Sequence, residues 1–391
     1  MSDEKFKLLE ERKTRYLAAM NLEKPDKVPI RLMLSEFSAK YAGYTFQEIY
    51  YELDKNIDCV NKLLNDFDLD TTGGAPSLWW ASLHDAVGAK YLKFAGRELD
   101  INTQFQYHEE EYMLPEDYDA FIENPTEWIL NTFMPRIHQE FADPGSYRAS
   151  VALIKGGIGM LTQLGANQKA WGTWAPEYGG VPTFTAFSKA PFDTLADTLR
   201  GLSGVMMDLY QRPEKVKAAI EAIIPHNIFY GMATSAGEME FPLFIPLHRG
   251  AFPFLNPKQW KEFYWPSLKQ VIEAFWANGK RTLFYAEGNW TPYLESIAEL
   301  PEKSIVFHVD QTDMAQAKKI LGGRFCISGN VPNTMLAFGK PDEVKEYVKR
   351  LIDEYAADGG FIIDAAAVIQ ADAKEENIRA LIEAAREYGV Y

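Results

Sequence analysis

The sequence predicts a single α/β domain, a (β/α)8 (TIM) barrel that spans residues 1–391. In the second half of the chain, short apolar runs alternate with segments of helical period, which indicates parallel strands joined by helices. Five such units occur there, and three further apolar runs lie upstream. Eight strands of this kind favour a closed barrel over an open sheet.

The expected strands are short and mostly apolar, as is typical of strands buried on both faces. The five strands of the second half are Phe241–His248, Thr282–Ala286, Ser304–Val309, Arg324–Ser328 and Phe361–Asp364. The three upstream strands are Val28–Leu34, Asp68–Thr72 and Val181–Phe187.

The expected helices carry recognisable start and stop signals. Asn256 followed by Pro257 is typical of a helix N-terminus. The segment Asp342–Ala357 repeats apolar residues with a 3.6-residue period, which predicts an amphipathic helix. Asp372 and Glu375 have the spacing of a capping box and predict the start of the last helix.

The stretch from about residue 75 to residue 180 interrupts the strand–helix rhythm. It is rich in tryptophan, which suits a pocket for a flat organic molecule as well as a large core. We expect this stretch to form insertions over the barrel mouth; its tryptophans include Trp79, Trp80, Trp128, Trp171 and Trp174.

Composition excludes several classes of protein. The net charge of −15 would repel phosphate backbones, which argues against nucleic-acid binding. No run of about eighteen apolar residues is present, so no membrane span is expected. The chain has two cysteines, Cys59 and Cys326, too few for a disulfide framework, and we expect a cytoplasmic protein.

Several segments, in their order along the chain, resemble the uroporphyrinogen decarboxylase superfamily. Each segment is weakly specific by itself, but the order covers nearly the whole chain. These segments are Glu11-Arg12, Lys24 to Pro29, Ser188 to Gly201 (SKAPFDTLADTLRG), Arg212 to Val216, Gly329 to Pro332 and Glu375 to Ile378. The resemblance implies the barrel fold and an active site at the C-terminal ends of the strands.

Three branches of that superfamily differ in their motifs. The decarboxylases carry an arginine-rich motif after the first strand, which the stretch Arg31 to Gly43 lacks. The methyltransferases that act on thiols carry His-x-Cys-Gly, where this chain has Tyr285-Ala286-Glu287-Gly288. The chain is most similar to the ether-cleaving methyltransferases that serve corrinoid proteins.

For that branch, a zinc pattern of Glu, fourteen residues, Glu, twenty residues and His is proposed. Glu287 and His308 are separated by twenty residues here, whereas Glu273 falls one residue short of the pattern. The resemblance therefore implies a zinc ion on Glu287 and His308.

Strand-end geometry adds a third candidate ligand. Glu287, His308 and Cys326 lie on three consecutive expected strands, and three protein ligands with one open position are typical of catalytic zinc. His308 as a hydrogen-bonded core histidine and Cys326 as an inert buried thiol stay open as alternatives.

Other strand ends supply candidate pocket residues. Tyr285 lies two residues before Glu287 and points the same way, so it is a candidate catalytic donor to a leaving oxygen or a filler of the barrel. The candidate substrate-binding residues are His248, Arg249, Trp79, Asn330 and Asp364, each with a purely structural role as the alternative.

Taken together, the residues and the resemblance predict a zinc-dependent methyltransferase. It would move the methyl group of a methoxylated aromatic compound to the cobalt of a corrinoid on a separate partner protein, with zinc masking the charge of the departing oxygen. The rival interpretations are a decarboxylase, a methyltransferase of the thiol or amine type, and an accessory protein that docks a corrinoid partner. A homo-oligomer stays open.

Overall fold

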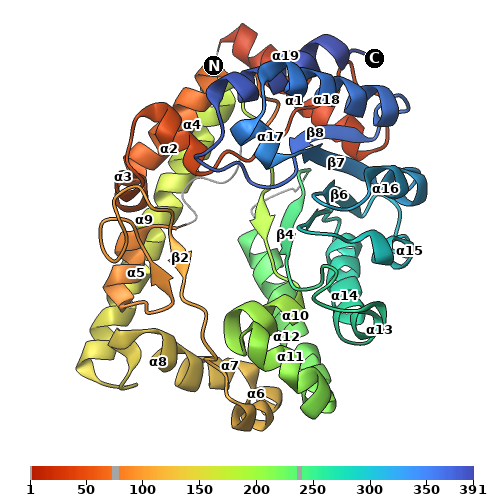
Figure 1. Ribbon diagram of the computed structural model, residues 1–391. Helices are drawn as coiled ribbons and strands as arrows, with labels where there is room; N and C mark the ends of the chain where they lie inside the picture. Colours follow the sequence, from red (N-terminus) through yellow and green to blue (C-terminus); the bar gives the residue numbers. More distant parts are fainter. Residues whose placement is uncertain (1, 73–78, 236–239) are drawn as a thin grey trace.

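The computed structural model describes residues 2–72, 79–235 and 240–391. Six parallel strands follow one another in chain order around the barrel (Figure 1). They are β3 (Ala186–Phe187), β4 (Leu243–Leu247), β5 (Thr282–Ala286), β6 (Ile305–Val309), β7 (Cys326–Val331) and β8 (Phe361–Ala365). The parallel barrel expected from the sequence is therefore confirmed.

The N-terminal part of the chain closes the barrel through single bridges rather than full strands. Ile30 forms a parallel bridge with Ile363 of β8, and the amide of Asp70 donates to the carbonyl of Ile30 at 3.2 Å. The amide of Thr72 then donates to the carbonyl of Val181 at 2.9 Å. The three upstream segments thus occupy the expected positions, but only β3 there forms a regular strand.

Helices cover the outside of the barrel. The principal ones are α4 (Leu53–Asp66), α9 (Tyr147–Tyr178), α12 (Pro213–Thr234), α14 (Trp265–Ala277), α15 (Leu294–Ile297), α16 (Met314–Leu321), α18 (Pro341–Tyr355) and α19 (Glu375–Tyr388). A further helix, α1 (Asp3–Met20), packs at the N-terminal ends of the strands, where the hydroxyl of Tyr16 donates to the carbonyl of Thr183.

The helix signals read from the sequence have mixed outcomes. Asn256 caps the start of α13 (Pro257–Gln259) as expected, and it does so through a capping box with Gln259. The capping box expected at Asp372 is wrong, because the residue before α19 is Lys374 and no side chain caps this helix.

The expected insertion is shorter than the sequence suggested, and its residues 75–78 lie outside the described residues. Its described part comprises α5 (Ala81–Val87), the hairpin of β1 (Leu92–Lys93) and β2 (Gln106–Tyr107), and α6 (Tyr118–Glu123) to α8 (Met134–Ile137). By contrast, α9 is the second barrel helix: its C-terminal part packs on α1 and α4, where the indole of Trp174 donates to Asn61 at 2.8 Å. Trp171 and Trp174 therefore belong to the barrel wall and not to its mouth.

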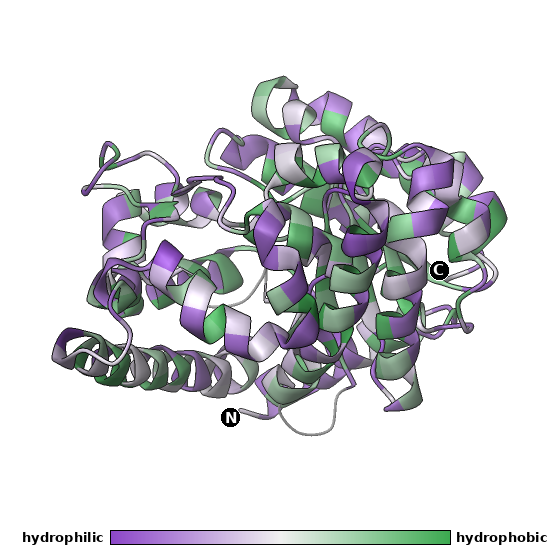
Figure 2. Cartoon of the chain, turned by 90° about the horizontal axis from the view of Figure 1, so that it is seen from below, coloured by the Kyte–Doolittle hydropathy of each residue, from purple (hydrophilic) through white to green (hydrophobic). Residues whose placement is uncertain are grey.

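Apolar side chains fill the interior and the layer between strands and helices. In Figure 2, green residues concentrate on the strands and on the inward turns of the surrounding helices. Within the described residues, even the longest helices are too short or too polar to cross a membrane.

Candidate active site

His248 and Glu287 meet at the mouth of the barrel. Each is the first residue after its strand, His248 after β4 and Glu287 after β5, so the parallel pairing of the two strands brings them together. The Nε2 atom of His248 lies 3.4 Å from Oε2 of Glu287. Both side chains keep more than a third of their surface exposed, so they are open to a molecule at the mouth.

Two aspartates behind His248 hold it in place. Buried Asp193 accepts hydrogen bonds from the backbone amides of His248 and Arg249 at 3.1 and 3.0 Å. Asp197 accepts from Nδ1 of His248 at 2.8 Å. We name Asp193, Asp197, His248 and Glu287 the mouth cluster.

The sequence analysis missed Asp193 and Asp197. They follow β3 directly and are four residues apart in the helical segment Pro191–Leu199, so both face β4. Their position after an expected strand was the available signal, but the segment had been used only for its family resemblance.

Burial and neighbouring charges shift the pKa values of the mouth cluster. Burial raises the pKa of Glu287, and the nearby charge of Asp310 adds to this increase although His248 opposes it. Burial lowers the pKa of His248, but its hydrogen bond with Asp197 and the charge of Glu287 outweigh burial and raise it above the ordinary value. Burial would raise the pKa of Asp197, yet its bond with His248 and the charges of Lys189 and Arg249 keep it low.

Arg249 is bound to other residues of the protein. Its Nε donates to Asp197, its Nη2 lies 3.5 Å from Glu109, and its guanidinium lies over the ring of Phe254. Asp197 also pairs with Lys189 at 3.0 Å. The structure thus brings Arg249 to the mouth, as expected, but with its charge already compensated.

Three aromatic rings contact one another on the hairpin side of the mouth. The ring centroid of Trp79 lies 5.4 Å from that of Phe105 and 5.6 Å from that of Tyr107. Desolvation raises the pKa of Tyr107, with smaller contributions from Tyr91 and from the negative charge of Asp197. Because Glu109, two residues after Tyr107, lies 3.5 Å from Arg249, we describe Trp79, Phe105 and Tyr107 as the aromatic wall of the mouth.

A chain segment after β2 ties the aromatic wall to the barrel. Glu109 reaches Arg249, and its Oε1 also accepts the amide of Leu202 at 3.0 Å. Glu111 pairs with the buried Arg200. Of these wall and tether residues the sequence analysis named only Trp79, because a two-stranded hairpin inside an irregular insertion leaves little periodic signal.

His308 lies below the mouth, inside the barrel, and is fully buried. Its Nε2 lies 3.0 Å from the carbonyl of Ala366, so this nitrogen carries the proton. Its Nδ1 lies 3.2 Å from both the guanidinium of Arg31 and the hydroxyl of Ser328. The ring stacks on Tyr285 with centroids 4.0 Å apart.

A buried ion pair surrounds this histidine. The Nε of Arg31 donates to Asp364 at 2.8 Å, and its Nη2 donates to Ser328 at 2.6 Å. Arg31, His308, Ser328 and Asp364 form the interior cluster. Asp364 therefore binds Arg31, where the sequence analysis expected a substrate contact, and Arg31 itself was not anticipated.

The expected zinc ligands lie at three different depths of the barrel. Tyr285 pairs with His308, and His308 pairs with Ser328. Glu287 thus lies two residues above this level and Cys326 two residues below it, an offset of roughly 13 Å along the strands at about 3.3 Å per residue.

The donor chemistry of His308 does not fit zinc either. Both ring nitrogens of His308 already contact protein atoms: Nε2 donates to the carbonyl of Ala366, and Nδ1 lies 3.2 Å from Arg31 and from Ser328. An imidazole binds zinc through a free lone pair, which His308 does not offer here. Across residues 2–72, 79–235 and 240–391, no three His, Cys, Asp or Glu side chains are arranged to hold a metal ion. Glu273 is exposed on α14.

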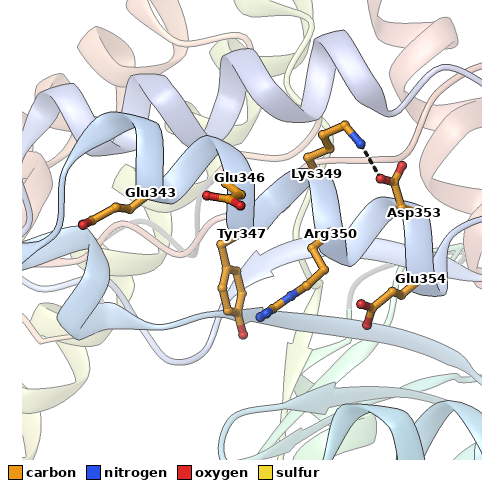
Figure 3. A pocket seen from close by; sticks show the side chains of 7 residues that line it. All are labelled: Glu343, Glu346, Tyr347, Lys349, Arg350, Asp353 and Glu354. Carbon is orange, nitrogen blue, oxygen red and sulfur yellow. Dashed lines mark hydrogen bonds and ion pairs between the residues drawn. The ribbon is translucent and has the colours of Figure 1, made fainter.

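Asn330 is held at the rim of the barrel. Its Nδ2 donates to the carbonyl of Asp310, and the hydroxyl of Tyr347 donates to its Oδ1. Tyr347 also lines a shallow hollow of about 480 Å³ on α18 (Figure 3). The hollow is a solvated charged helix face away from the mouth cluster; the other side chains drawn are Glu343, Glu346, Lys349, Arg350, Asp353 and Glu354.

Comparisons with known proteins agree with this barrel. The chain shares its fold with a methyltransferase from Methanosarcina mazei, with a TM-score of 0.65, 17% identity, and coverage of 96% of this chain and 98% of that one. At this identity the likeness concerns the fold alone.

Two curated relatives are described as uroporphyrinogen decarboxylase. The protein of Christiangramia forsetii is 29% identical over 176 residues, which is 45% of this chain and 43% of that protein. The protein of Flavobacterium johnsoniae is 25% identical over 178 residues, 45% of this chain and 44% of that protein. The matched region thus spans less than half the length of either relative.

A protein-family model completes the comparison. The model for uroporphyrinogen decarboxylase (URO-D) matches residues 159–388, from α9 to the end of α19. This region holds β3 to β8 and the whole mouth cluster. Because the match covers more than half of the chain, the protein belongs to the uroporphyrinogen decarboxylase (URO-D) family.

Proposed function

We propose that this protein is a methyltransferase that moves the methyl group of a methoxylated aromatic compound to a corrinoid carried by a partner protein. The observation that carries the proposal is the contact between Glu287 and His248 at the mouth, 3.4 Å apart, with Asp197 bonded to the other nitrogen of the imidazole. The aromatic wall beside them suits a flat ring.

The main obstacle to cleaving a methyl–aryl ether is the negative charge that develops on its oxygen. Phenols have a pKa near 10, so an unprotonated phenoxide is a poor leaving group at neutral pH. A group that gives a proton to the oxygen while the C–O bond breaks removes this obstacle. Glu287 suits that task, because burial raises its pKa and its side chain is accessible at the mouth.

In the proposed step, the electron pair of the C–O bond stays on the oxygen, which takes the proton of Glu287 and leaves as a phenol. His248 then returns a proton to Glu287, and Asp197 holds the imidazole by its Nδ1 in the orientation that this transfer needs. The corrinoid, when bound, supplies the nucleophile that accepts the methyl group.

Zinc dependence stays a prediction of the family resemblance. The placement of His308 and Cys326 does not support it, so the proposed step uses no metal. Analysis of metal content in the purified protein, with activity measured before and after chelation, tests this. We expect chelation to leave turnover unchanged.

Decarboxylation is the second candidate, because the curated relatives carry that name. A porphyrin with several carboxylates needs free cations in the site. Arg249 and Lys189 both pair with Asp197, and Arg31 pairs with Asp364 inside the barrel. Because these cations are already paired with aspartates, the site supports an aryl ether rather than a polycarboxylate as the substrate.

The test is a methyl-transfer assay with the whole protein, reduced cobalamin as acceptor and a panel of methoxybenzenes as donors. Uroporphyrinogen and a methylated thiol serve as competing substrates. We expect cobalamin methylation and free phenol from at least one methoxybenzene. Decarboxylation of uroporphyrinogen without any methyl transfer would contradict the proposal.

The variant Glu287→Gln tests the proton donor. It keeps the size of the side chain but removes its acid, so turnover should fall by about 100-fold or more. Glu273→Gln makes the same chemical change on the exposed face of α14 and should leave turnover unchanged. Equal turnover in both variants would rule out Glu287 as the proton donor.

A further inference from the structure

Two neighbouring glutamates in the segment after β2 bind different partners. Glu110 pairs with His108 of the same segment at 2.7 Å. Glu109 instead approaches Nη2 of Arg249, 3.5 Å away at the end of β4. In Figure 1, this segment leads from β2 down to α6. The contact between Glu109 and Arg249 therefore joins the insertion to the mouth of the barrel.

The carboxylate of Glu109 is held in place by the backbone of another element. Its Oε1 accepts the amide of Leu202 at 3.0 Å, at the start of α11 (Leu202–Gln211). Its Oε2 is the atom that faces Arg249. Because each oxygen has its own partner, the side chain is fixed at both, and its contact with Arg249 is part of the fold.

Arg249 would bind an anion if Glu109 did not neutralise it. Its Nε donates to Asp197, and its guanidinium lies over the ring of Phe254. The side chain still keeps 22% of its surface exposed, so a ligand at the mouth could reach it. An arginine in such a position is well suited to bind the carboxylate of a small molecule. Here Glu109 occupies Nη2 and supplies the opposing charge within the protein.

The acidic groups of the mouth make a further negative charge unfavourable. Glu287 and Asp310 are the first residues after the paired ends of β5 and β6. Burial raises the pKa of both, and the charge of Asp310 adds to the increase at Glu287. Lys189 and Arg249, which lie beside these groups, already pair with Asp197. A carboxylate that entered here would lose water without gaining a free cation.

We infer that Glu109 is a specificity-determining residue, which neutralises Arg249 and so restricts the site to methoxylated rings without a carboxylate. The inference rests on the proposed function and adds the chemical class of the ring to it. Uncharged methoxybenzenes and methoxyphenols would bind beside the aromatic wall. Methoxybenzoates would be excluded, because the charge of Glu109 opposes them and Arg249 is not free to bind them.

The variant Glu109→Gln removes the charge and keeps the shape. Glutamine retains a carbonyl oxygen for the amide of Leu202, but its amide nitrogen cannot accept a hydrogen bond from Arg249. The segment should therefore stay in place while Arg249 becomes free to bind a carboxylate. Glu110→Gln makes the same chemical change at the next position, which pairs with His108 and not with Arg249, and is the matched control.

The experiment compares two rings of the same size by titration calorimetry with the full chain, at about pH 7.5. 4-Methoxybenzamide is uncharged, and 4-methoxybenzoate carries one negative charge. We expect the wild type to bind the benzamide at least about tenfold more tightly. Glu109→Gln should lower this ratio of dissociation constants at least about tenfold, and Glu110→Gln should leave it unchanged. Thermal unfolding of each variant checks that it is folded.

A double variant separates charge from structure. Glu109→Gln combined with Arg249→Met has no guanidinium to bind the benzoate, so the preference for the benzamide should return towards the wild-type ratio. A general loosening of the mouth in Glu109→Gln would not be reversed in this way. A wild type that binds the benzoate as tightly as the benzamide, or equal ratios in Glu109→Gln and Glu110→Gln, would overturn the inference.

Methyl transfer to reduced cobalamin, measured with the same two rings, distinguishes this failure from a failure of the proposed function. Equal transfer from the benzamide and the benzoate would keep the methyltransferase and overturn the role of Glu109. The expected binding ratios without methyl transfer from either ring would support the role of Glu109 and contradict the proposed reaction.

Discussion

The mouth cluster and the interior cluster lie a few residues apart in one barrel, yet they are built for different tasks. In the interior cluster, Arg31 pairs with Asp364, and His308 is in contact at both ring nitrogens with no surface exposed. In the mouth cluster, His248 and Glu287 face one another at 3.4 Å and remain accessible.

The two clusters differ in whether they leave polar side-chain atoms accessible to a substrate. A buried polar group must bond to its neighbours, since leaving it without partners is costly. The interior groups follow this rule except at Nη1 of Arg31, which has no hydrogen-bond partner among the described residues. At the mouth, Asp193 and Asp197 fix the position of His248 from behind, and the side of Glu287 that faces the mouth is left for a substrate.

The largest expected effect concerns the interior cluster. Arg31→Met would leave Asp364 without its cation and should lower the free energy of unfolding by about 3–5 kcal/mol. Burial already raises the pKa of Asp364 to about 6 despite Arg31, so protonation relieves the unpaired charge at lower pH. Urea unfolding should therefore show a smaller loss at pH 5 than at pH 8.

An exposed arginine serves as the control for that change. Arg148 pairs with Glu140 on the surface, and Arg148→Met should leave the free energy of unfolding nearly unchanged, because exposed ion pairs contribute little. Similar losses for both variants would show that the interior cluster does not hold the barrel together.

The second effect concerns the support of the mouth cluster. Asp197→Asn removes the charge that raises the pKa of His248, so this pKa should fall. Because the proposed step needs a proton on the His248–Glu287 pair, turnover should be lost at a lower pH than in the wild type. We expect a turnover reduced by about tenfold at neutral pH, and a pH profile measured from pH 5 to pH 9 tests both points. If the basic limb of the pH profile does not shift in Asp197→Asn, His248 takes no part in the proton transfer.

A third effect concerns the aromatic wall. Tyr107→Ala removes one ring of the wall and should raise KM for a methoxybenzene several-fold, in line with about 0.5–1.5 kcal/mol for an aromatic contact. The value of kcat should change little, because Tyr107 takes no part in the proposed proton transfer. Tyr107→Phe keeps the ring and should restore KM; a lowered kcat with unchanged KM would place Tyr107 in the chemistry instead.

The smallest expected effect tests whether the buried thiol of Cys326 takes part in the reaction. Cys326→Ala should lower the free energy of unfolding by about 1–2 kcal/mol through loss of packing. Methyl transfer should stay within about twofold of the wild type, because the thiol lies well below Glu287. A variant that is folded but inactive, with reduced metal content, would restore the zinc site implied by the resemblance.

The barrel could be predicted because its strands are apolar, regularly spaced and separated by strong helix signals. β5 was predicted with its observed bounds. The segments near Val28 and Asp68 were placed correctly but form only isolated bridges, and prolines at positions such as 29 and 182 remove the donors that longer ladders need.

The candidate site could be predicted only in part. Strand ends placed His248, Arg249 and Glu287 at the mouth, since that follows from the barrel itself. The depth of His308 and Cys326 depends on strand register, which sequence spacing does not contain. The partners of His308 come from β7 and from the segments near residues 31 and 366, far apart in the chain.

The stacked rings of Tyr285 and His308, with Arg31 in contact with His308, fill the barrel under the mouth. In the proposed reaction, donor and acceptor would both enter through the mouth, so the smaller donor would have to bind before the protein-borne acceptor. Substrate binding would therefore be ordered, and the demethylated product would be released only after the acceptor has dissociated. An excess of acceptor should slow the reaction, because acceptor bound at the mouth of the free enzyme would block the methyl donor.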